Sequence, residues 1–308
     1  MRITQNMTAN NAVYNLQQGQ ARLDKLQNLV SAGQMVSQPS DDPISGRLLL
    51  DIGDKLKAYD QYASNNTKAT SWLKFTGTAL QGLTDVVYQA RNVAAKMNNG
   101  STDPNIRQSA HDQLVELKKQ LIDAANSQYG DQYVFGGANN LGPPFSNANN
   151  NYAGDSAQLA VEIANNTSQA ISVTGDRLLK GTTTPAGIPP TYGTVDVMQT
   201  FDDLIAAVGD LATPTNVANM VTANQNIEGG AKQLSAATSD ILSRTTRLDN
   251  MATLNENNKN TLLSITTNIQ EVDYARLGVE LSNQKMAYEA SLSVTAKLSQ
   301  LSLLNYMP

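Results

Sequence analysis

The C-terminal stretch from Asp273 to Met307 constrains the fold most, because it has the pattern of one long amphipathic helix. It contains no proline and one glycine, Gly278. Its larger apolar residues mostly recur at intervals of three, four or seven, which marks one face of a helix. These residues are Leu277, Leu281, Met286, Tyr288, Leu292, Val294, Leu298, Leu301 and Leu304. One helix cannot enclose a core, so this stretch requires helical partners along its length.

The N-terminal stretch has a matching pattern and is the first candidate partner. Small and apolar residues alternate there in steps of three and four, as in a heptad seam. They are Ala9, Ala12, Leu16, Gly19, Leu23, Leu26 and Val30. We therefore predict that the two ends of the chain form a terminal coiled-coil domain, from residues 1–42 together with 262–308.

Both ends are almost free of charge. No charged residue lies between Arg2 and Arg22, and none follows Lys297. Solvated helices usually carry ion pairs four residues apart, whereas Gln, Asn, Ser and Thr cover these ends. This indicates surfaces that pack on identical neighbours or line a narrow channel. As isolated segments the ends are expected to be disordered and to fold on assembly.

The predicted subunit-interface residues lie on these two terminal helices. They are Leu16, Leu23, Leu26, Val30, Leu277, Leu281, Leu292, Leu298, Leu301 and Leu304. A second group forms the predicted inter-domain linker, where two prolines interrupt the helical pattern after Gly33. That linker consists of Pro39, Ser40, Asp41, Asp42 and Pro43.

Two helical segments are predicted inside the terminal pair. Asp42 before Pro43 reads as a helix N-cap followed by proline at the first helical position, and a three-four alternation then continues to about Asn98. At about 1.5 Å per residue this helix is on the order of 80 Å long, which predicts a rod. Asp103-Pro104 opens the next helix with the same cap. The rod domain is predicted from residues 43–136 with 200–261.

The helical pattern is interrupted between the two parts of the predicted rod domain, 43–136 and 200–261. We predict a small β-rich outer domain there, at residues 137–199. Leu159, Val161 and Ile163 alternate with less apolar residues, which predicts a half-buried strand. A turn at 165–168 and a return strand with Ile171 and Val173 follow. Helix is predicted to resume at Thr200, where Thr200 and Asp203 resemble a capping box, and to stop at Pro214. The predicted fold class is therefore mainly α, an elongated multi-layer helical coiled-coil rod with a β-rich central insertion.

Composition excludes several functions. The chain of 308 residues has a formal net charge of -5 and a pI near 4.9, which argues against nucleic acid as a partner. It has no cysteine, so disulfides and thiolate metal sites are excluded. No apolar run reaches the length of a membrane span, so no membrane insertion is expected. The N-terminus lacks the pattern of a Sec signal peptide, so the chain is expected to stay in the cytoplasm or to leave by a route without a cleavable signal.

No pattern of catalytic residues is present. His111 is the only histidine, and it lies one position away from an apolar stripe, so we interpret it as a surface residue. Asp41-Asp42 and Asp202-Asp203 stand at helix starts, where capping and the helix dipole explain them. No phosphate-binding glycine loop is found. We expect no enzymatic activity, no cofactor and no metal site.

Several stretches resemble the flagellin superfamily, and within it the hook-associated junction proteins. They are Met1-Arg2-Ile3-Thr4, the Pro39–Pro43 linker, the Gly130–Gly137 stretch with Pro144-Phe145, and the closing Leu301–Tyr306. The resemblance covers nearly the whole chain apart from much of the insertion. It implies a flagellin-like fold whose terminal helices line an export channel.

The resemblance also implies partners. They are further copies of the chain in a ring, the hook-side junction protein, flagellin, and an export chaperone before secretion through the type III apparatus. The implied place is outside the cell, between hook and filament. Flagellin itself is the first alternative, and a type III secreted coiled-coil effector is the second. Against flagellin stand the Met-Arg-Ile-Thr start and the Asn-Tyr-Met-Pro ending.

Overall fold

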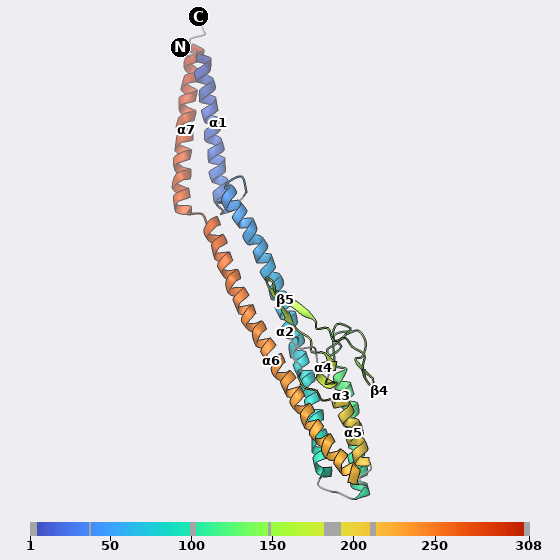
Figure 1. The fold of residues 1–308 in the computed structure, drawn as a ribbon. Helices are drawn as coiled ribbons and strands as arrows, with labels where there is room; N and C mark the ends of the chain where they lie inside the picture. Colours follow the sequence, from blue (N-terminus) through green and yellow to red (C-terminus); the bar gives the residue numbers. More distant parts are fainter. Residues whose placement is uncertain are drawn as a thin grey trace. The chain divides into compact units, whose positions relative to one another are not determined.

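The computed structural model describes residues 5–36, 38–98, 103–146, 149–181, 192–209 and 214–304. Helices dominate this part of the chain (Figure 1). They are α1 (Gln5–Ala32), α2 (Pro43–Asn98), α3 (Pro104–Ala125), α4 (Gly175–Leu179), α5 (Val197–Gly209), α6 (Pro214–Gln270) and α7 (Tyr274–Leu304). The strands are β1 (Gln128–Tyr129), β2 (Gln132–Tyr133), β3 (Phe145–Ser146), β4 (Asn149–Tyr152), β5 (Ala160–Ala164) and β6 (Thr167–Ala170). The predicted mainly α class is confirmed.

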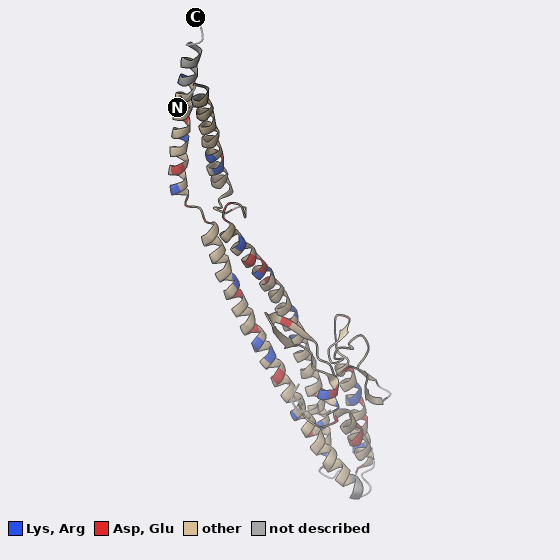
Figure 2. Cartoon of the chain, turned by 45° about the horizontal axis from the view of Figure 1, so that its top comes forward, with Lys and Arg blue, Asp and Glu red and all other residues tan. Residues whose placement is uncertain are grey.

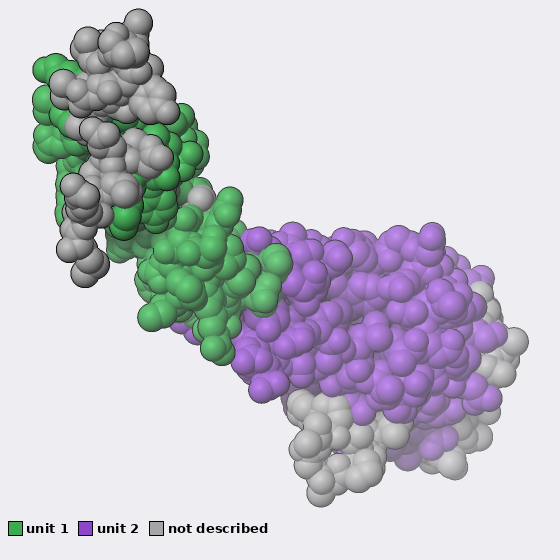
Figure 3. Space-filling view, turned by 90° about the horizontal axis from the view of Figure 1, so that it is seen from above, with its two compact units in different colours: residues 1–58, 258–308 green, residues 59–257 purple. Residues whose placement is uncertain are grey.

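The chain divides into two compact units (Figure 3). Unit 1 comprises residues 1–58 and 258–308, and unit 2 comprises residues 59–257. In unit 1, α1 and α7 pack side by side over their lengths (Figure 1). No charged residue occurs on α1 before Arg22, so most of this helix is drawn without charge colours (Figure 2).

Unit 2 contains the hydrophobic core, built from α2, α3, α5 and α6. Leucines recur on the inner faces of these helices at helical spacing, and many of their side chains are inaccessible to solvent. Examples are Leu73, Leu80 and Leu83 on α2, Leu114 and Leu121 on α3, Leu204 on α5 and Leu234 on α6. The insertion adds Ile163, Leu178 and Leu179 to the same core, next to Phe135, which precedes it in the sequence. The insertion is therefore packed into unit 2 rather than appended to it.

Three antiparallel strand pairs make up the β structure: β1–β2, β3–β4 and β5–β6. The turn between β5 and β6 is tight, and Asn166 in it has a φ of 54°, a left-handed conformation that asparagine tolerates. The predicted first strand is confirmed. The return strand was placed too late, because β6 ends at Ala170, before Ile171 and Val173.

The start of α5 corrects the predicted capping box. The helix begins at Val197, and the cap is Asp196, whose Oδ1 accepts from the Gln199 amide at 2.9 Å. The Thr200 hydroxyl instead donates to the Asp196 carbonyl oxygen at 2.7 Å, within the first turn. Pro214 does not end a helix but begins α6, because proline suits the first helical position, where no amide donor is needed.

Candidate assembly surfaces

Helices α1 and α7 form an intrachain seam. Among the half-buried positions of α1, Ala12, Leu16, Gly19, Leu23, Leu26 and Val30 follow the predicted heptad steps, and Leu29 is half-buried as well. On α7 the corresponding side chains are the buried Leu277 and the half-buried Leu281, Gln284, Tyr288 and Thr295. The Gln284 side chain also donates through Nε2 to the Gly19 carbonyl oxygen at 3.3 Å, directly across the seam.

Six predicted interface residues therefore lie in contact positions within one chain. They are Leu16, Leu23, Leu26, Val30, Leu277 and Leu281. Leu292 differs from them, because its side chain is 52% exposed. Leu298, Leu301 and Leu304 belong to α7 by their backbone, but their side chains lie outside the described residues. Whether any of these residues contacts another subunit stays a prediction.

A second apolar face of α7 is left uncovered within the chain. Val279 and Met286 are 63% and 58% exposed. Each follows a seam position, Leu277 or Gln284, by two residues, and is therefore turned by about 200° around the helix axis. Val294 on α7 and Val13 and Tyr14 on α1 are also largely exposed. The packed pair of helices α1 and α7, which we call the terminal hairpin although the two helices are not consecutive, thus has apolar side chains on its outer faces as well as in its seam.

Unit 1 has almost no core of its own. Among its described residues, the buried apolar side chains are Val36, Ile52, Val272 and Leu277. Helices are stabilised in proteins mainly by packing of an apolar face, and ordering each residue costs about 1–2 kcal/mol of conformational entropy. A two-helix hairpin with so few buried side chains requires further surfaces to pack against.

The two segments that connect the terminal helices to the rest of unit 1 pair with one another and form a joint. Gln34 and Glu271 make a single antiparallel bridge, and the Met35 amide donates to the Gln270 carbonyl oxygen at 2.9 Å. Gly33 ends α1 with a φ of 64°, and a Cβ at this position would lie 2.7 Å from the Tyr274 hydroxyl oxygen. The positive φ therefore favours glycine at this position of the joint.

The predicted linker residues form a turn and a helix cap in this joint. The Asp41 amide donates to the Gln38 carbonyl oxygen at 2.9 Å, which closes a turn around Pro39 and Ser40. Asp42 Oδ1 accepts from the amides of Ile44 and Ser45 at 3.0 and 3.2 Å, so the predicted N-cap is confirmed, and α2 begins at Pro43.

Hydrogen bonding at the cap also affects the charge of Asp42. The Ser45 hydroxyl donates to Asp42 Oδ2 at 2.7 Å. This bond, followed by those from the Ser45 and Ile44 amides, lowers the pKa of Asp42 from its ordinary value of 3.8. Nearby, Lys25 on α1 forms an ion pair with Asp41 at 3.4 Å. The joint is thus held by backbone pairing, a capped helix and one exposed ion pair.

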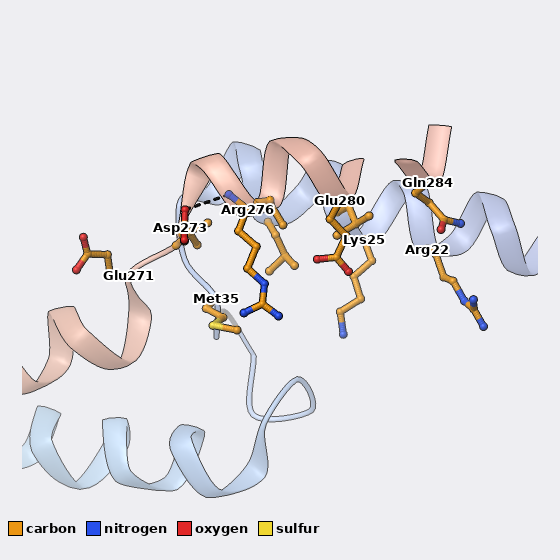
Figure 4. A pocket seen from close by; sticks show the side chains of 12 residues that line it. Arg22, Lys25, Met35, Glu271, Asp273, Arg276, Glu280 and Gln284 are labelled. Atoms are coloured by element: carbon orange, nitrogen blue, oxygen red, sulfur yellow. Dashed lines mark hydrogen bonds between the residues drawn. The ribbon is translucent and has the colours of Figure 1, made fainter. Parts of the chain in front are cut away.

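A groove of about 620 Å³ lies beside the joint, between the end of α1 and the start of α7 (Figure 4). Its floor is apolar, with Leu26, Leu29, Met35, Val272 and Leu277. Its rim carries both signs of charge, from Arg22, Lys25 and Arg276 and from Glu271, Asp273 and Glu280. Asp273 is occupied as the cap of α7, since its Oδ1 accepts from the Ala275 and Arg276 amides at 3.0 Å. The mixed rim favours no single class of charged ligand.

In unit 2, polar side chains of α6 that the sequence analysis did not single out bind the insertion. Gln233, Arg244 and Asn255 are buried, and each donates hydrogen bonds to main-chain carbonyl oxygens of the segment from Ile163 to Val195. These residues lie among the buried apolar side chains of α6, which include Ile227, Leu234, Ile241 and Leu248. The spacing of these three polar residues, 11 positions apart, was the signal that could have revealed them.

No catalytic arrangement is found in the described part of the chain. His111 on α3 lies 3.2 Å from Asp112 through its Nδ1, at a partly exposed position. The described residues include no group of three or more His, Asp or Glu side chains arranged to hold a metal ion. None of the described helices has a stretch long and apolar enough to cross a membrane.

The chain is similar to known flagellar proteins. Residues 3–140 match the family described as bacterial flagellin N-terminal helical region. The chain is 27% identical over 221 residues to flagellar hook-associated protein 3 of Salmonella typhimurium, covering 71% of this chain and 69% of that protein. It is 26% identical over 215 residues to the Escherichia coli protein of the same name, covering 70% of this chain and 68% of that protein. The resemblance to flagellin-type proteins read from the sequence is confirmed.

Solved structures share the fold. A putative flagellar hook-associated protein from Vibrio parahaemolyticus superposes with a TM-score of 0.64 at 20% identity, covering 75% of this chain and all of that one. FlgL from Xanthomonas campestris gives a TM-score of 0.58 at 22% identity, covering 70% of this chain and 99% of that one. The flagellin-like fold class is therefore confirmed.

Proposed function

We infer that this chain, which contains the flagellin N-terminal helical region and has the fold of flagellar hook-associated proteins, is a structural subunit at the junction of the bacterial hook and filament. Its curated relatives are named as hook-associated proteins rather than as filament subunits. This favours the junction role over flagellin. The function is mechanical, and no enzymatic activity, cofactor or metal is part of the proposal.

The near absence of a core in unit 1 is the observation that carries this proposal. The α1–α7 hairpin buries few side chains but exposes apolar ones such as Val279 and Met286. Burying apolar surface is worth roughly 25 cal/mol per Å², so the hairpin gains stability when copies of the chain pack around it. A ring of identical subunits supplies such surfaces, and Leu292 with the adjacent C-terminal leucines would lie between them.

A ring of this kind between hook and filament would also contact other proteins. One side would contact the hook-side junction protein, and the other would serve as the base on which flagellin polymerises. Before export, the apolar terminal helices require protection, which a flagellar export chaperone would provide. The scarcity of charge at both ends supports passage through the flagellar type III apparatus without a cleavable signal, and an extracellular place afterwards.

The domain layout belongs to the same proposal. Residues 1–42 with 262–308 would form the inner coiled-coil domain, 43–136 with 200–261 the helical rod domain, and 137–199 the outer domain. The Pro39–Pro43 segment, with its turn and helix cap, would be the joint between the first two. Its rigidity would set the relative orientation of these domains in the assembled ring.

Electron microscopy of a deletion strain, with an assay for flagellin in the culture medium, tests this function. Bare hooks with flagellin shed into the medium are expected, because filament growth lacks its base. Bare hooks without flagellin anywhere, restored by this gene alone, would make the chain the filament subunit. Normal flagella would overturn both interpretations and favour a secreted coiled-coil effector.

A further inference from the structure

Three polar side chains of α6 face the insertion at equal intervals. Gln233, Arg244 and Asn255 are spaced 11 residues apart and are only 1%, 7% and 4% exposed. Eleven residues make about three helical turns, so the three side chains share one face and are about 16 Å apart along the axis. Buried polar groups in this position need hydrogen-bond partners.

All their partners in the insertion are main-chain atoms. Asn255 Nδ2 donates to the Ile163 carbonyl oxygen at 2.7 Å. Arg244 Nη1 donates to the carbonyl oxygens of Ala170 and Ser172 at 3.2 and 3.1 Å.

Gln233 binds the far end of the same segment through both polar atoms of its side chain. Its Nε2 donates to the carbonyl oxygens of Leu178 and Val195 at 2.7 and 3.1 Å. Its Oε1 accepts from the Val195 amide at 3.2 Å. The glutamine thus joins α4 to the segment that leads into α5.

The contacts follow the order of the chain. As the insertion proceeds from β5 to the start of α5, its binding partner moves back along α6 from Asn255 to Arg244 to Gln233. The attachment points from Ile163 to Val195 therefore follow α6 in the direction opposite to the course of that helix. Since these bonds use carbonyl oxygens, they do not depend on which side chains the insertion carries.

We propose that Gln233, Arg244 and Asn255 are positioning residues that form a carbonyl-binding ladder and fix the outer insertion in register on α6. The ladder makes the insertion and α6 move as one body, and it leaves the outward side chains of the insertion free for other contacts. This proposal goes beyond the junction function and does not depend on it.

Arg244 has a second attachment that strengthens the middle of the ladder. Its Nη2 pairs with Asp240 Oδ2 at 2.7 Å, and the same oxygen accepts from the Tyr192 hydroxyl at 2.7 Å. Tyr192 lies just before α5, so the arginine reaches the returning chain through Asp240 as well. A charge-assisted pair of this kind orients the guanidinium group toward the Ala170 and Ser172 carbonyl oxygens.

Native-state amide hydrogen exchange on the full chain tests the ladder. The variants are Gln233→Leu, Arg244→Met and Asn255→Leu, which remove the donors and leave an apolar side chain in their place. Each is expected to accelerate exchange about tenfold or more in its own segment, because the variants lose between one and three buried hydrogen bonds. The segments are residues 178–181 and 192–195 for Gln233, residues 170–173 for Arg244 and residues 163–167 for Asn255.

Matched controls lie on the exposed surface of the same helix. Gln225→Leu, Arg247→Met and Asn250→Leu make the same changes at exposed positions and are expected to leave the insertion amides unchanged. Gln233→Glu adds a finer comparison, because it keeps the acceptor for the Val195 amide while removing the donor to Leu178. Protection is expected to persist at Val195 and to fall around Leu178.

Two outcomes would overturn the proposal. Unchanged exchange in the insertion would show that the ladder bonds do not hold it. Equal acceleration in the insertion and in the α3–α5 core would show general destabilisation rather than positioning. If Arg244→Met does not fold because Asp240 is left without its partner, Arg244→Met with Asp240→Asn removes that charge, and the same segment-specific result is required.

Discussion

Tyr192 lies where the insertion returns to the helices, and its hydroxyl donates to Asp240. Burial, followed by this hydrogen bond, raises the pKa of Tyr192 above its ordinary value of 10.0. The folded state thus favours the neutral phenol. The buried, hydrogen-bonded phenol of Tyr192 therefore contributes to the free energy of unfolding below its ordinary pKa of 10.0. This contribution is lost as the pH rises toward the higher pKa of the folded state.

Urea unfolding between about pH 9 and pH 11 checks this linkage. We expect the unfolding midpoint of the wild type to fall across this range. Tyr192→Phe removes the titrating group, so its midpoint is expected to start lower and to fall less steeply. The same slope in both proteins would contradict the assignment.

Leu277 is the most buried leucine of the α1–α7 hairpin, at 8% exposure. Leu277→Ala is expected to cost about 2 kcal/mol, the low end for a buried leucine, because a small hairpin relaxes around the space. Hydrogen exchange on α1 and α7 measures this loss. Faster exchange should be confined to the hairpin, and protection equal to the wild type there would mean that the seam does not stabilise α1.

At the level of a single helix, α6 contains a glycine, Gly229, at a position where a larger side chain would come too close to a neighbouring residue. Gly229 lies inside the helix, where glycine costs roughly 0.5–1 kcal/mol relative to alanine, yet a Cβ there would lie 2.9 Å from Val195 Cγ2. Gly82 on α2 has no neighbouring atom within 4 Å of such a Cβ. A substitution at Gly82 therefore reports the effect of helix propensity alone, whereas a substitution at Gly229 also reports the effect of packing.

Alanine substitutions at these two glycines are expected to have opposite effects. Gly82→Ala should stabilise the chain by about 0.5–1 kcal/mol. Gly229→Ala should destabilise it, because overpacking costs typically 1–3 kcal/mol. Urea unfolding of both variants measures the difference, and a stabilised Gly229→Ala would show that the start of α5 can move away freely.

The joint responds to acid through the cap of α2. Because the folded-state pKa of Asp42 is lowered, its contribution to stability is present above the ordinary value of 3.8 and is lost as pH falls through the folded value. Exchange at the Ile44 and Ser45 amides is expected to accelerate below that pH. Asp42→Asn keeps an acceptor for both amides but cannot titrate, so persistence of the acid response in this variant would assign it to another group.

At the scale of the whole molecule, the sequence predicts the long helices well because their signals are local. Asp42-Pro43 and Asp103-Pro104 mark two helix starts that the structure places at Pro43 and Pro104. The heptad steps from Ala12 to Val30 reappear as the half-buried positions of α1. Caps and periodicity need only a few consecutive residues to be recognised.

The insertion and its attachment were less predictable because they depend on distant contacts. Asp196 rather than Thr200 caps α5, and no apolar pattern distinguishes the two. α4 was missed because its five residues are too few to show a period. Gln233, Arg244 and Asn255 bind carbonyl oxygens up to 92 residues away, which only the folded chain brings together.

The central claim is that the outer faces of the terminal hairpin are completed by neighbouring subunits. Met286→Asp and Leu292→Asp, made singly, test it, because both side chains are largely exposed in the isolated chain. An exposed substitution usually changes stability by less than about 0.5 kcal/mol, so the purified variants should keep their helicity. Leu141→Asp in the insertion, also at an exposed position, is the matched control.

The decisive measurement is electron microscopy of a deletion strain complemented with each variant, with the variant itself assayed in the culture medium. Met286→Asp and Leu292→Asp are expected to be exported and to leave bare hooks, whereas Leu141→Asp is expected to give normal filaments. Normal filaments on all three would contradict assembly through the hairpin faces. Retention of a variant inside the cell would assign that face to export rather than to subunit packing.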